Sequence, residues 1–501
     1  MTTIVLATVN AKYMHASLGL RYLYANLGEL RRHSRLMEFT INERAMDIVE
    51  RILAEEPHIV GLGVYIWNVA ISTQIVELIK RIRPQTVVVL GGPEVSHEYD
   101  EQAIVDAADH VIPGMADLAF ADLCRRVMDG DGPLDKIVQP ADFGLRDLRL
   151  PYGDYTAEDL RNRLLYVEAS RGCPFKCEFC LSALDKTAWP FDLGAFLQQM
   201  DELHARGARH FRFVDRTFNL KQSTTVAILQ FFLERMSDSL FLHFELIPDR
   251  LPTAVKELVA RFPPGSMQFE IGVQTFTQQV QDLINRRQEN DRTIRNLRWL
   301  RYNTHAHVHA DLIFGLPGET LETFRDGFDR LVAASPHEIQ VGILKRLRGS
   351  PIIRHTQTHD LRFNPDPPYN ILSTDRIDFA TMQSMNRFAR YWDLIVNSGR
   401  FESVRPLLLG DRPFDNFHAL AGWLYRTTGQ THRIALGRLF SLVRQGAIEA
   451  LGISADTAAR ALERDQGRLQ RANRRDPQSR TRHIHRQTRH LHANQDFSYE
   501  H

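Results

Sequence analysis

Residues 171–183 read RGCPFKCEFCLSA and contain three of the four cysteines of the chain. Cys173, Cys177 and Cys180 are spaced C-x3-C-x2-C in a loop that directly follows the apolar stretch LLYVEAS (164–170). Three thiolates on one short loop can hold three irons of a 4Fe–4S cluster and leave the fourth iron open to another ligand. A zinc site with its fourth ligand elsewhere, or three plain buried cysteines, are the alternatives. The spacing favours the cluster, because zinc motifs usually pair two close dyads.

The bulk composition excludes several classes of protein. The fourth cysteine, Cys124, lies in a predicted helix of another segment and is interpreted as a small apolar core residue. Four cysteines among 501 residues do not make a secreted disulfide framework, and the start of the chain lacks a basic signal-peptide region, so a reducing cytoplasm is expected. We find no run of 18 apolar residues, and the formal net charge is +1, so neither a membrane nor a nucleic acid is expected as a partner.

Strand and helix patterns alternate around the cysteine loop, across residues 161–355. This alternation predicts a parallel (β/α)6 barrel, full or partial. In such barrels the chemistry lies at the C-terminal ends of the strands, and the cysteine loop directly follows the first predicted strand. The six predicted strands are residues 164–170, 210–215, 241–247, 267–275, 308–315 and 338–344.

Residues 1–130 show a second alternation of strands and helices. Continuous apolar runs such as HIVGLGVYI (58–66) indicate strands that are buried on both faces. This pattern predicts a doubly wound, flavodoxin-like parallel sheet. Residues 131–160 are rich in Pro, Gly and Asp and are predicted to be a surface linker. The predicted strands are residues 4–9, 34–40, 58–66, 86–92 and 109–114.

After Pro351 the alternation stops, and residues 356–465 are predicted to form an α-helical C-terminal domain. Its aromatic side chains could line a substrate pocket, but their helical spacing favours a place in the core. Residues 466–501 are polar and basic and are predicted to be a disordered tail. The aromatic residues in question are Tyr391, Trp392, Trp423 and Tyr425.

The cysteine loop RGCPFKCEFC resembles the signature loop of the radical S-adenosylmethionine (SAM) enzymes. The resemblance implies that SAM chelates the open iron through its amino and carboxylate groups. It also implies that an electron from the cluster cleaves SAM to methionine and a 5′-deoxyadenosyl radical. Phe179, just before the third cysteine, matches the aromatic residue that usually packs beside the adenine.

Further stretches extend this resemblance over residues 160–350. FEIGVQTFTQQVQDLINR (269–286) resembles the fourth-strand segment of the oxygen-independent coproporphyrinogen oxidase and methylthiotransferase branch. By position, this match implies SAM contacts for Gln274 and Arg286. The alternatives are ion pairs at the rim of the barrel for the acids Asp215 and Glu245, and a solvated helix charge for Arg286. The other implied SAM residues are Asp215 in FVDRTFN, Glu245 in FELIPDRL and Gly315 in HADLIFGLPGET.

The N-terminal domain resembles the cobalamin-binding domain of cobalamin-dependent radical SAM enzymes, through NAKYMHASLGLRYLYANL and LGGPEVS. The D-x-H-x-x-G motif of His-ligated cobalamin proteins is absent, so a polar role for His15 at a helix start is favoured over cobalt ligation. The fifth-strand turn reads GMAD (114–117) where the class usually has G-E-G-E. The alternative is a vestigial domain used only for packing. Candidate cobalamin residues are Asn10, Tyr13, His15, Tyr65, Asn68, Gly91, Gly92, Glu94 and Ser96.

The C-terminal region resembles an uncharacterised helical domain that follows the barrel in one bacterial branch of these proteins, through LKRLRGSPI (344–352) and ARYWDLIVNSGRF (389–401). Together the resemblances imply a cobalamin-dependent radical SAM methyltransferase acting on an unactivated carbon. They imply a small-molecule or natural-product-like substrate and an external electron donor of the flavodoxin or ferredoxin type. A radical SAM cyclase or oxidoreductase without methyl transfer, a methylthiotransferase and a non-catalytic SAM- or cobalamin-binding sensor are the alternatives.

Overall fold

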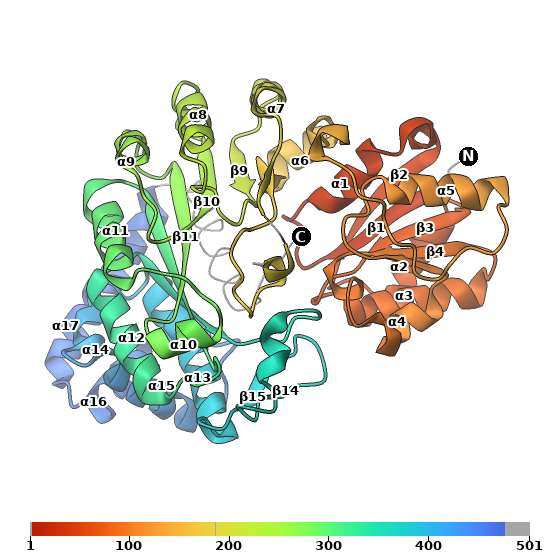
Figure 1. Cartoon of the computed structure of the whole chain (residues 1–501). Coiled ribbons are helices and arrows are strands. Elements are labelled where there is room, and N and C mark those ends of the chain that lie inside the picture. Colours follow the sequence, from red (N-terminus) through yellow and green to blue (C-terminus); the bar gives the residue numbers. More distant parts are fainter. Residues whose placement is uncertain (1–2, 186, 476–501) are drawn as a thin grey trace.

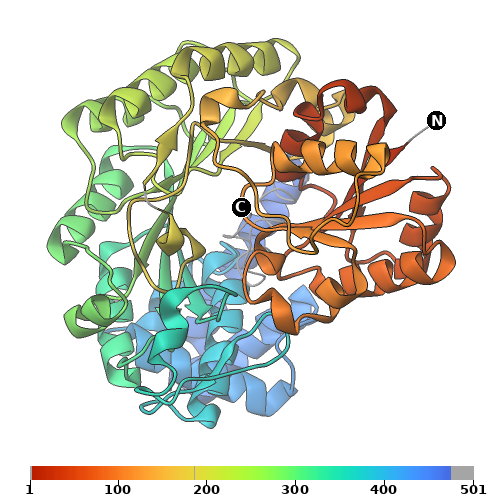
Figure 2. The ribbon, with the colours of Figure 1, turned by 45° about the vertical axis from the view of Figure 1, so that its right-hand side comes forward.

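The computed structural model describes residues 3–185 and 187–475. Two parallel sheets and a set of C-terminal helices make up this part of the chain (Figure 1). The N-terminal sheet and the six-stranded sheet lie side by side, and the C-terminal helices pack against the far end of the six-stranded sheet (Figures 1 and 2). Among the described residues, none of the helices is long and apolar enough to span a membrane.

The N-terminal sheet has five parallel strands in the order β2-β1-β3-β4-β5. All residues of β1 are buried, because helices cover both faces of the sheet. One apolar cluster joins the sheet to α2, α3 and α4, and a second joins the other face to α1 and α5. This confirms the predicted doubly wound fold. The elements are β1 (Ile4–Asn10), α1 (Leu18–Ala25), β2 (Ser34–Thr40), α2 (Ala45–Leu53), β3 (Ile59–Gly63), α3 (Val69–Ile82), β4 (Val87–Gly91), α4 (Ala103–Ala107), β5 (His110–Ile112) and α5 (Ala119–Asp129).

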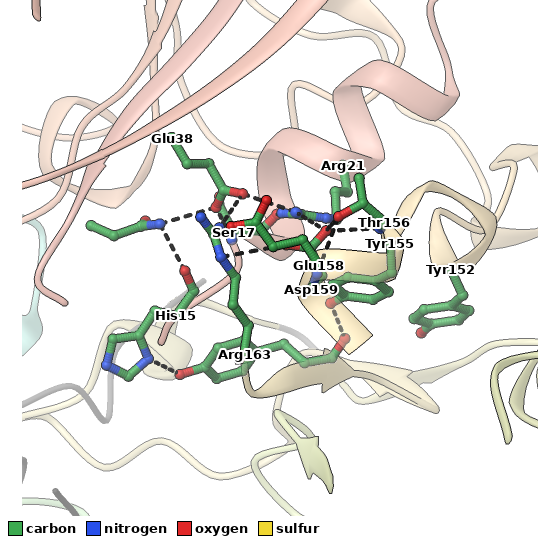
Figure 3. Close-up of polar contacts among 12 residues, drawn as sticks. His15, Ser17, Arg21, Glu38, Tyr152, Tyr155, Thr156, Glu158, Asp159 and Arg163 are labelled. Atoms are coloured by element: carbon green, nitrogen blue, oxygen red, sulfur yellow. Dashed lines mark hydrogen bonds and ion pairs between the residues drawn. The ribbon is translucent and has the colours of Figure 1, made fainter. Parts of the chain in front are cut away.

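The segment between the two sheets, predicted as a surface linker, packs tightly in its second half. Tyr152 and Tyr155 are fully buried, and their hydroxyls donate hydrogen bonds to backbone carbonyls of the first barrel strand and its C-terminal end. Helix α6 (Ala157–Asn162) contributes Asp159, which is buried against Arg21 of the N-terminal domain (Figure 3). These contacts dock the N-terminal domain onto the barrel.

The second sheet has six parallel strands in the order β13-β12-β11-β10-β9-β6, which confirms the predicted partial barrel. Helices cover its outer face (Figure 1). The short antiparallel strands β7 (Ser170–Arg171) and β8 (Trp189–Pro190) bracket the cysteine loop. The main elements are β6 (Leu165–Val167), α7 (Leu193–Ala205), β9 (His210–Phe213), α8 (Gln222–Leu233), β10 (Phe241–Leu246), α9 (Thr253–Val259), β11 (Met267–Gln274), α10 (Gln278–Leu283), α11 (Asn290–Asn303), β12 (His307–Phe314), α12 (Leu321–Ala334) and β13 (Glu338–Ile343).

The C-terminal helices share one apolar core with the barrel instead of forming a core of their own. Trp392 is 1% exposed and packs edge-on against Phe328 of α12, with ring centroids 4.8 Å apart. The Asn397 side chain exchanges hydrogen bonds with the backbone of Ile339 and so covers the free edge of β13. The elements are η7 (Pro351–His355), the hairpin β14 (Arg362–Phe363) and β15 (Ile371–Ser373), α13 (Phe379–Trp392), α14 (Arg405–Leu409), α15 (Pro413–Thr428), α16 (Leu436–Glu449) and α17 (Ala455–Arg475).

Two details of the C-terminal region depart from the sequence prediction. The β14–β15 hairpin stands in a segment that was expected to be helical. Helix α17 continues to Arg475, past the predicted start of the tail at residue 466. The rest of the predicted tail, residues 476–501, lies outside the described residues.

Candidate active site

A cavity of about 200 Å³ lies at the C-terminal ends of the barrel strands, and all three cysteines of the loop line it. Gly172 starts the loop with φ +93°, and a Cβ there would lie 2.5 Å from the Thr187 carbonyl oxygen, so only glycine is accommodated. Burial raises the pKa of the Cys173 thiol to about 12 and also raises the pKa of Cys180. Within the described residues, no three His, Cys, Asp or Glu side chains gather closely enough to hold one metal ion.

Four of the six predicted SAM residues line this cavity: Phe179, Glu245, Gln274 and Arg286. Glu245, near the end of β10, lies 3.5 Å from the Arg216 guanidinium. Burial raises the pKa of Glu245 to about 7, against the opposing charge of Arg216. A carboxyl poised near neutrality in a cavity is typical of a functional site.

Gln274 and Arg286 approach the cavity from the end of β11 and the turn after α10. Gln274 has a left-handed backbone, with φ +68°, and its buried Oε1 has no hydrogen-bond partner in the described part of the chain. Strained residues and unsatisfied buried acceptors concentrate where a ligand completes the structure. Arg286 Nη1 lies 3.6 Å from the Cys177 sulfur, and Nη2 donates to the Gly272 carbonyl.

The other two predicted SAM residues lie outside the lining of this cavity. Asp215 is 2% exposed and accepts hydrogen bonds from the Ala169 backbone and the Ser170 hydroxyl. It therefore joins the end of β9 to the start of the cysteine loop. Gly315 has φ +93°, and a Cβ there would lie 2.7 Å from Ile371 of the C-terminal region. Its missing side chain makes room for that packing.

A second cavity, of about 340 Å³, lies between the C-terminal edge of the N-terminal sheet and the barrel. The strand order places the sheet's switch point between β1 and β3, which is where ligands of doubly wound sheets bind. Glycines at the ends of β3, β4 and β5 leave the edge bare, so that a ligand can approach the backbone closely. These glycines are Gly63, Gly91, Gly92 and Gly114.

Five of the nine candidate cobalamin residues line this second cavity: Asn10, Tyr65, Gly91, Gly92 and Ser96. The other four lie outside its lining. Tyr13 is exposed, and its hydroxyl donates to Glu158. Asn68 is buried and caps the turn after β3, where its Oδ1 accepts from the Tyr65 backbone at 2.8 Å.

His15 and Glu94 serve contacts between domains. The His15 ring is hydrogen-bonded to the Tyr166 hydroxyl of β6 (Figure 3), and burial lowers its pKa to about 3. Glu94 points towards the C-terminal region and accepts hydrogen bonds from Tyr369 at 2.5 Å and from Arg348 at 2.9 Å.

Several residues that line the two cavities were not predicted from the sequence. Ser182 and Arg216 line both cavities and so form a wall that the two share. Arg171 lines the second cavity and pairs with Asp117 at 3.0 Å and with Glu168 at 2.7 Å. Arg216 directly follows Asp215 at the end of the second barrel strand. It could have been predicted, because functional residues of such barrels lie at the C-terminal ends of the strands. Nothing local predicts the pairing of Arg171 with the turn after β5.

The three parts of the chain match three protein families. Residues 4–124 match the B12 binding domain, and residues 167–331 match the radical SAM superfamily. Residues 357–489 match a protein family of unknown function, DUF4080.

Two curated methyltransferases match more than half of this chain. The cobalamin-dependent radical SAM methyltransferase TokK of Streptomyces tokunonensis is 25% identical over 58% of this chain and 47% of its own length. The 2-(S-pantetheinyl)-carbapenam-3-carboxylate methyltransferase of Streptantibioticus cattleyicolor is 23% identical over 56% of this chain and 46% of its own. The chain thus spans about half the length of these relatives. The structure of TsrM from Kitasatospora setae with cobalamin and a [4Fe-4S] cluster has the same fold over 73% of this chain and 78% of that chain, with a TM-score of 0.58 at 17% identity.

Proposed function

The chain is a radical SAM protein with an N-terminal B12 binding domain, and we propose that it methylates an unactivated carbon of a small-molecule or natural-product-like substrate. The two methyltransferase relatives support this proposal. A 4Fe–4S cluster, SAM and cobalamin are the cofactors, and an external donor of the flavodoxin or ferredoxin type would supply electrons. When bound, the cluster gives the electron that splits SAM into methionine and a 5′-deoxyadenosyl radical, and cobalamin carries the methyl group.

The residues of the first cavity fit a cluster and SAM. Cys173, Cys177 and Cys180 would hold the cluster, and their thiols would lose their protons when iron binds. The unsatisfied Oε1 of Gln274 is an acceptor for an N–H of SAM. Glu245 in its ionised form would accept a hydrogen bond from the amino group of SAM.

The second cavity combines glycine-lined strand ends with polar side chains, which suits a ligand that approaches the backbone closely. The bare backbone at the ends of three strands permits close approach, and Asn10 and Ser96 add polar groups at the rim. The docked barrel closes the cavity from the other side with Ser170 and Arg171. Cobalamin held there would lie between the ends of these strands and the barrel residues that line the cavity.

The observation that carries the proposal is the shared wall of the two cavities. Ser182, which follows the third cysteine, and Arg216 line both of them. A substrate beside this wall can present one carbon to SAM and then to cobalamin without leaving the protein. Holding three reactants in line supplies much of the rate enhancement of such a reaction.

Anaerobic reconstitution with iron, sulfide and cobalamin tests this function. The reconstituted protein should show the visible absorption of a 4Fe–4S cluster and form 5′-deoxyadenosine from SAM and dithionite. The variant Cys177→Ala should abolish cleavage, whereas Cys124→Ala should not, because Cys124 is buried in α5, away from both cavities. Equal cleavage by wild type and Cys177→Ala would refute the radical SAM assignment.

Methyl transfer has its own readout. With a substrate that is turned over, S-adenosylhomocysteine should appear together with 5′-deoxyadenosine, since methylation would consume one SAM as the methyl source and a second as the radical source. Formation of 5′-deoxyadenosine and a modified substrate without S-adenosylhomocysteine would replace methylation by a cyclisation or oxidation.

A further inference from the structure

Between β13 and β15 the chain runs past the cysteine loop and the turn after β4. Residues 345–371, called the strap below, are teal in Figures 1 and 2 and lie between the barrel and the N-terminal domain. The strap contacts the cysteine loop at one site and the turn after β4 at another. These are the elements that line the first and the second cavity, respectively.

At the cluster end, the strap binds the cysteine loop through Glu178, which lies between Cys177 and Cys180. Glu178 is 2% exposed. Its backbone N–H donates to the Ile284 carbonyl at 3.0 Å, and its carbonyl accepts from the Ile352 backbone at 2.9 Å. The loop is therefore held from both sides by backbone hydrogen bonds, one of which comes from the strap.

The Glu178 side chain is held by the strap as well. His355 Nε2 lies 2.7 Å from the carboxylate, and Arg354 pairs with the other carboxylate oxygen. The His355 ring also bonds to the backbone of Leu283, at the end of α10. The turn after α10 presents Arg286 to the Cys177 sulfur. One imidazole thus ties the cysteine loop to the turn that contacts it.

At the opposite end, the strap grips the turn after β4 through Glu94. Glu94 is 4% exposed, and its carboxylate accepts from the Tyr369 hydroxyl at 2.5 Å and from Arg348 Nε at 2.9 Å. Arg348 also donates to the Tyr369 hydroxyl at 3.1 Å, which completes a closed triangle. Removing one partner from such a buried group leaves the others unsatisfied.

A second contact at this end reaches the lining of the second cavity. Glu98 accepts from Arg346 at 2.5 Å and from the Gly349 backbone at 3.0 Å. Gly349 has φ +80°, and a Cβ there would lie 2.3 Å from the His97 ring. Because His97 lines the second cavity, the strap backs that wall directly.

We propose that the strap sets the spacing between the two cofactor sites, with His355 and Tyr369 as its positioning residues. This inference rests on the proposed function. Neither residue lines either cavity, so each acts through a buried carboxylate: His355 through Glu178 on the cluster side, and Tyr369 through Glu94 on the cobalamin side. A site for radical chemistry between bound groups needs rigid support, because the reacting atoms move out of position when the residues around them are loosely held.

The two cofactors themselves supply the probe. In the reduced holoprotein, the 4Fe–4S cluster and cob(II)alamin are both paramagnetic, so pulsed electron paramagnetic resonance can measure the distribution of their separation. Wild type should give one narrow distribution. His355→Phe and Tyr369→Phe should each widen it by at least about twofold, while each chain still holds about four irons, as one cluster, and one cobalamin. His355→Gln should restore the narrow distribution, because its amide can still donate to Glu178.

The matched control is Arg362→Gln. Arg362 lies in the same strap but forms an exposed pair with Asp360 and contacts neither turn. It should leave the distribution unchanged. If Tyr369→Phe fails to fold, Glu98→Gln, at a partly exposed pair on the same side, replaces it. If His355→Phe fails to fold, Arg354→Gln, which removes the exposed partner of Glu178, replaces it. Unchanged widths in His355→Phe and Tyr369→Phe would overturn the positioning role, whereas a wild-type protein that binds neither cluster nor cobalamin would overturn the proposed function instead.

Discussion

Replacing His15 tests how the docking of the N-terminal domain depends on pH. His15 is 1% exposed, and its ring bonds to the Tyr166 hydroxyl of the first barrel strand. The backbone beside it also joins the two domains, because Leu164 N–H donates to the Met14 carbonyl at 2.8 Å. Burial, together with the nearby charge of Arg212, lowers the pKa of His15 to about 3. The folded protein therefore keeps this imidazole neutral.

The magnitude follows from the two pKa values. In the unfolded chain His15 titrates near 6.5, so below this pH the unfolded state binds a proton that the folded state rejects. The stability that the neutral His15 contributes is fully present above pH 6.5. The free energy of unfolding then falls by about 1.4 kcal/mol per pH unit as the pH drops towards 3. Between pH 7 and pH 5 the loss that His15 causes is about 2 kcal/mol.

Urea unfolding at pH 7 and pH 5, followed by circular dichroism, measures this loss. Other groups also titrate in this range, so the informative quantity is the difference between wild type and His15→Gln. The variant should lose about 2 kcal/mol less than wild type on going to pH 5. The exposed His33 is the control, and His33→Gln should lose as much as wild type. Equal losses in wild type and His15→Gln would refute the burial argument.

Three further predictions concern the docking network, the shared core and the SAM cavity. Arg21→Met removes one of the two arginines that pair with the buried carboxylates of Glu38 and Asp159, and should lower the free energy of unfolding in urea by about 2–3 kcal/mol. The exposed Arg44→Met should leave it almost unchanged, and equal effects would contradict the network. Trp392→Ala should lower the free energy of unfolding by about 3–5 kcal/mol. The barrel and the C-terminal helices should still unfold in one calorimetric transition, and two separate transitions would argue against a shared core. Gln274→Ala should weaken equilibrium binding of SAM about tenfold, and an unchanged Kd would remove Gln274 from the site.

The sheets were predictable because their strands carry a strong local signal. Parallel strands covered on both faces are continuous apolar runs, and 58–66 was such a run. The ordered strand is shorter, Ile59–Gly63, because the chain leaves the sheet at the bare edge that lines the second cavity. Glu245 and Gln274, which the family resemblance implied as SAM contacts, lie at strand ends, where the chemistry of barrels is found.

Some candidate residues lie outside the linings of the two cavities, and their side chains or backbone contact distant segments instead. The Asp215 carboxylate accepts hydrogen bonds from two donors that directly precede the cysteine loop, and Gly315 faces Ile371. Glu94 follows the glycines of the β4 turn, as a cobalamin contact would, but its carboxylate turns towards Tyr369. No local pattern encodes a partner 275 positions away, so sequence periodicity cannot distinguish a ligand contact from a domain contact at such a position.

The same distant contacts give the C-terminal region a reason to accompany the other two domains. A six-stranded open sheet has a free edge at β13, and Asn397 occupies its backbone groups. The strap then connects this edge to both cavities, through Glu178 on one side and Glu94 on the other. A chain that lost the region would expose the edge and release both buried carboxylates at once. The region is therefore part of the barrel's architecture, and its influence on both cofactor sites follows from where the chain must run after its last strand.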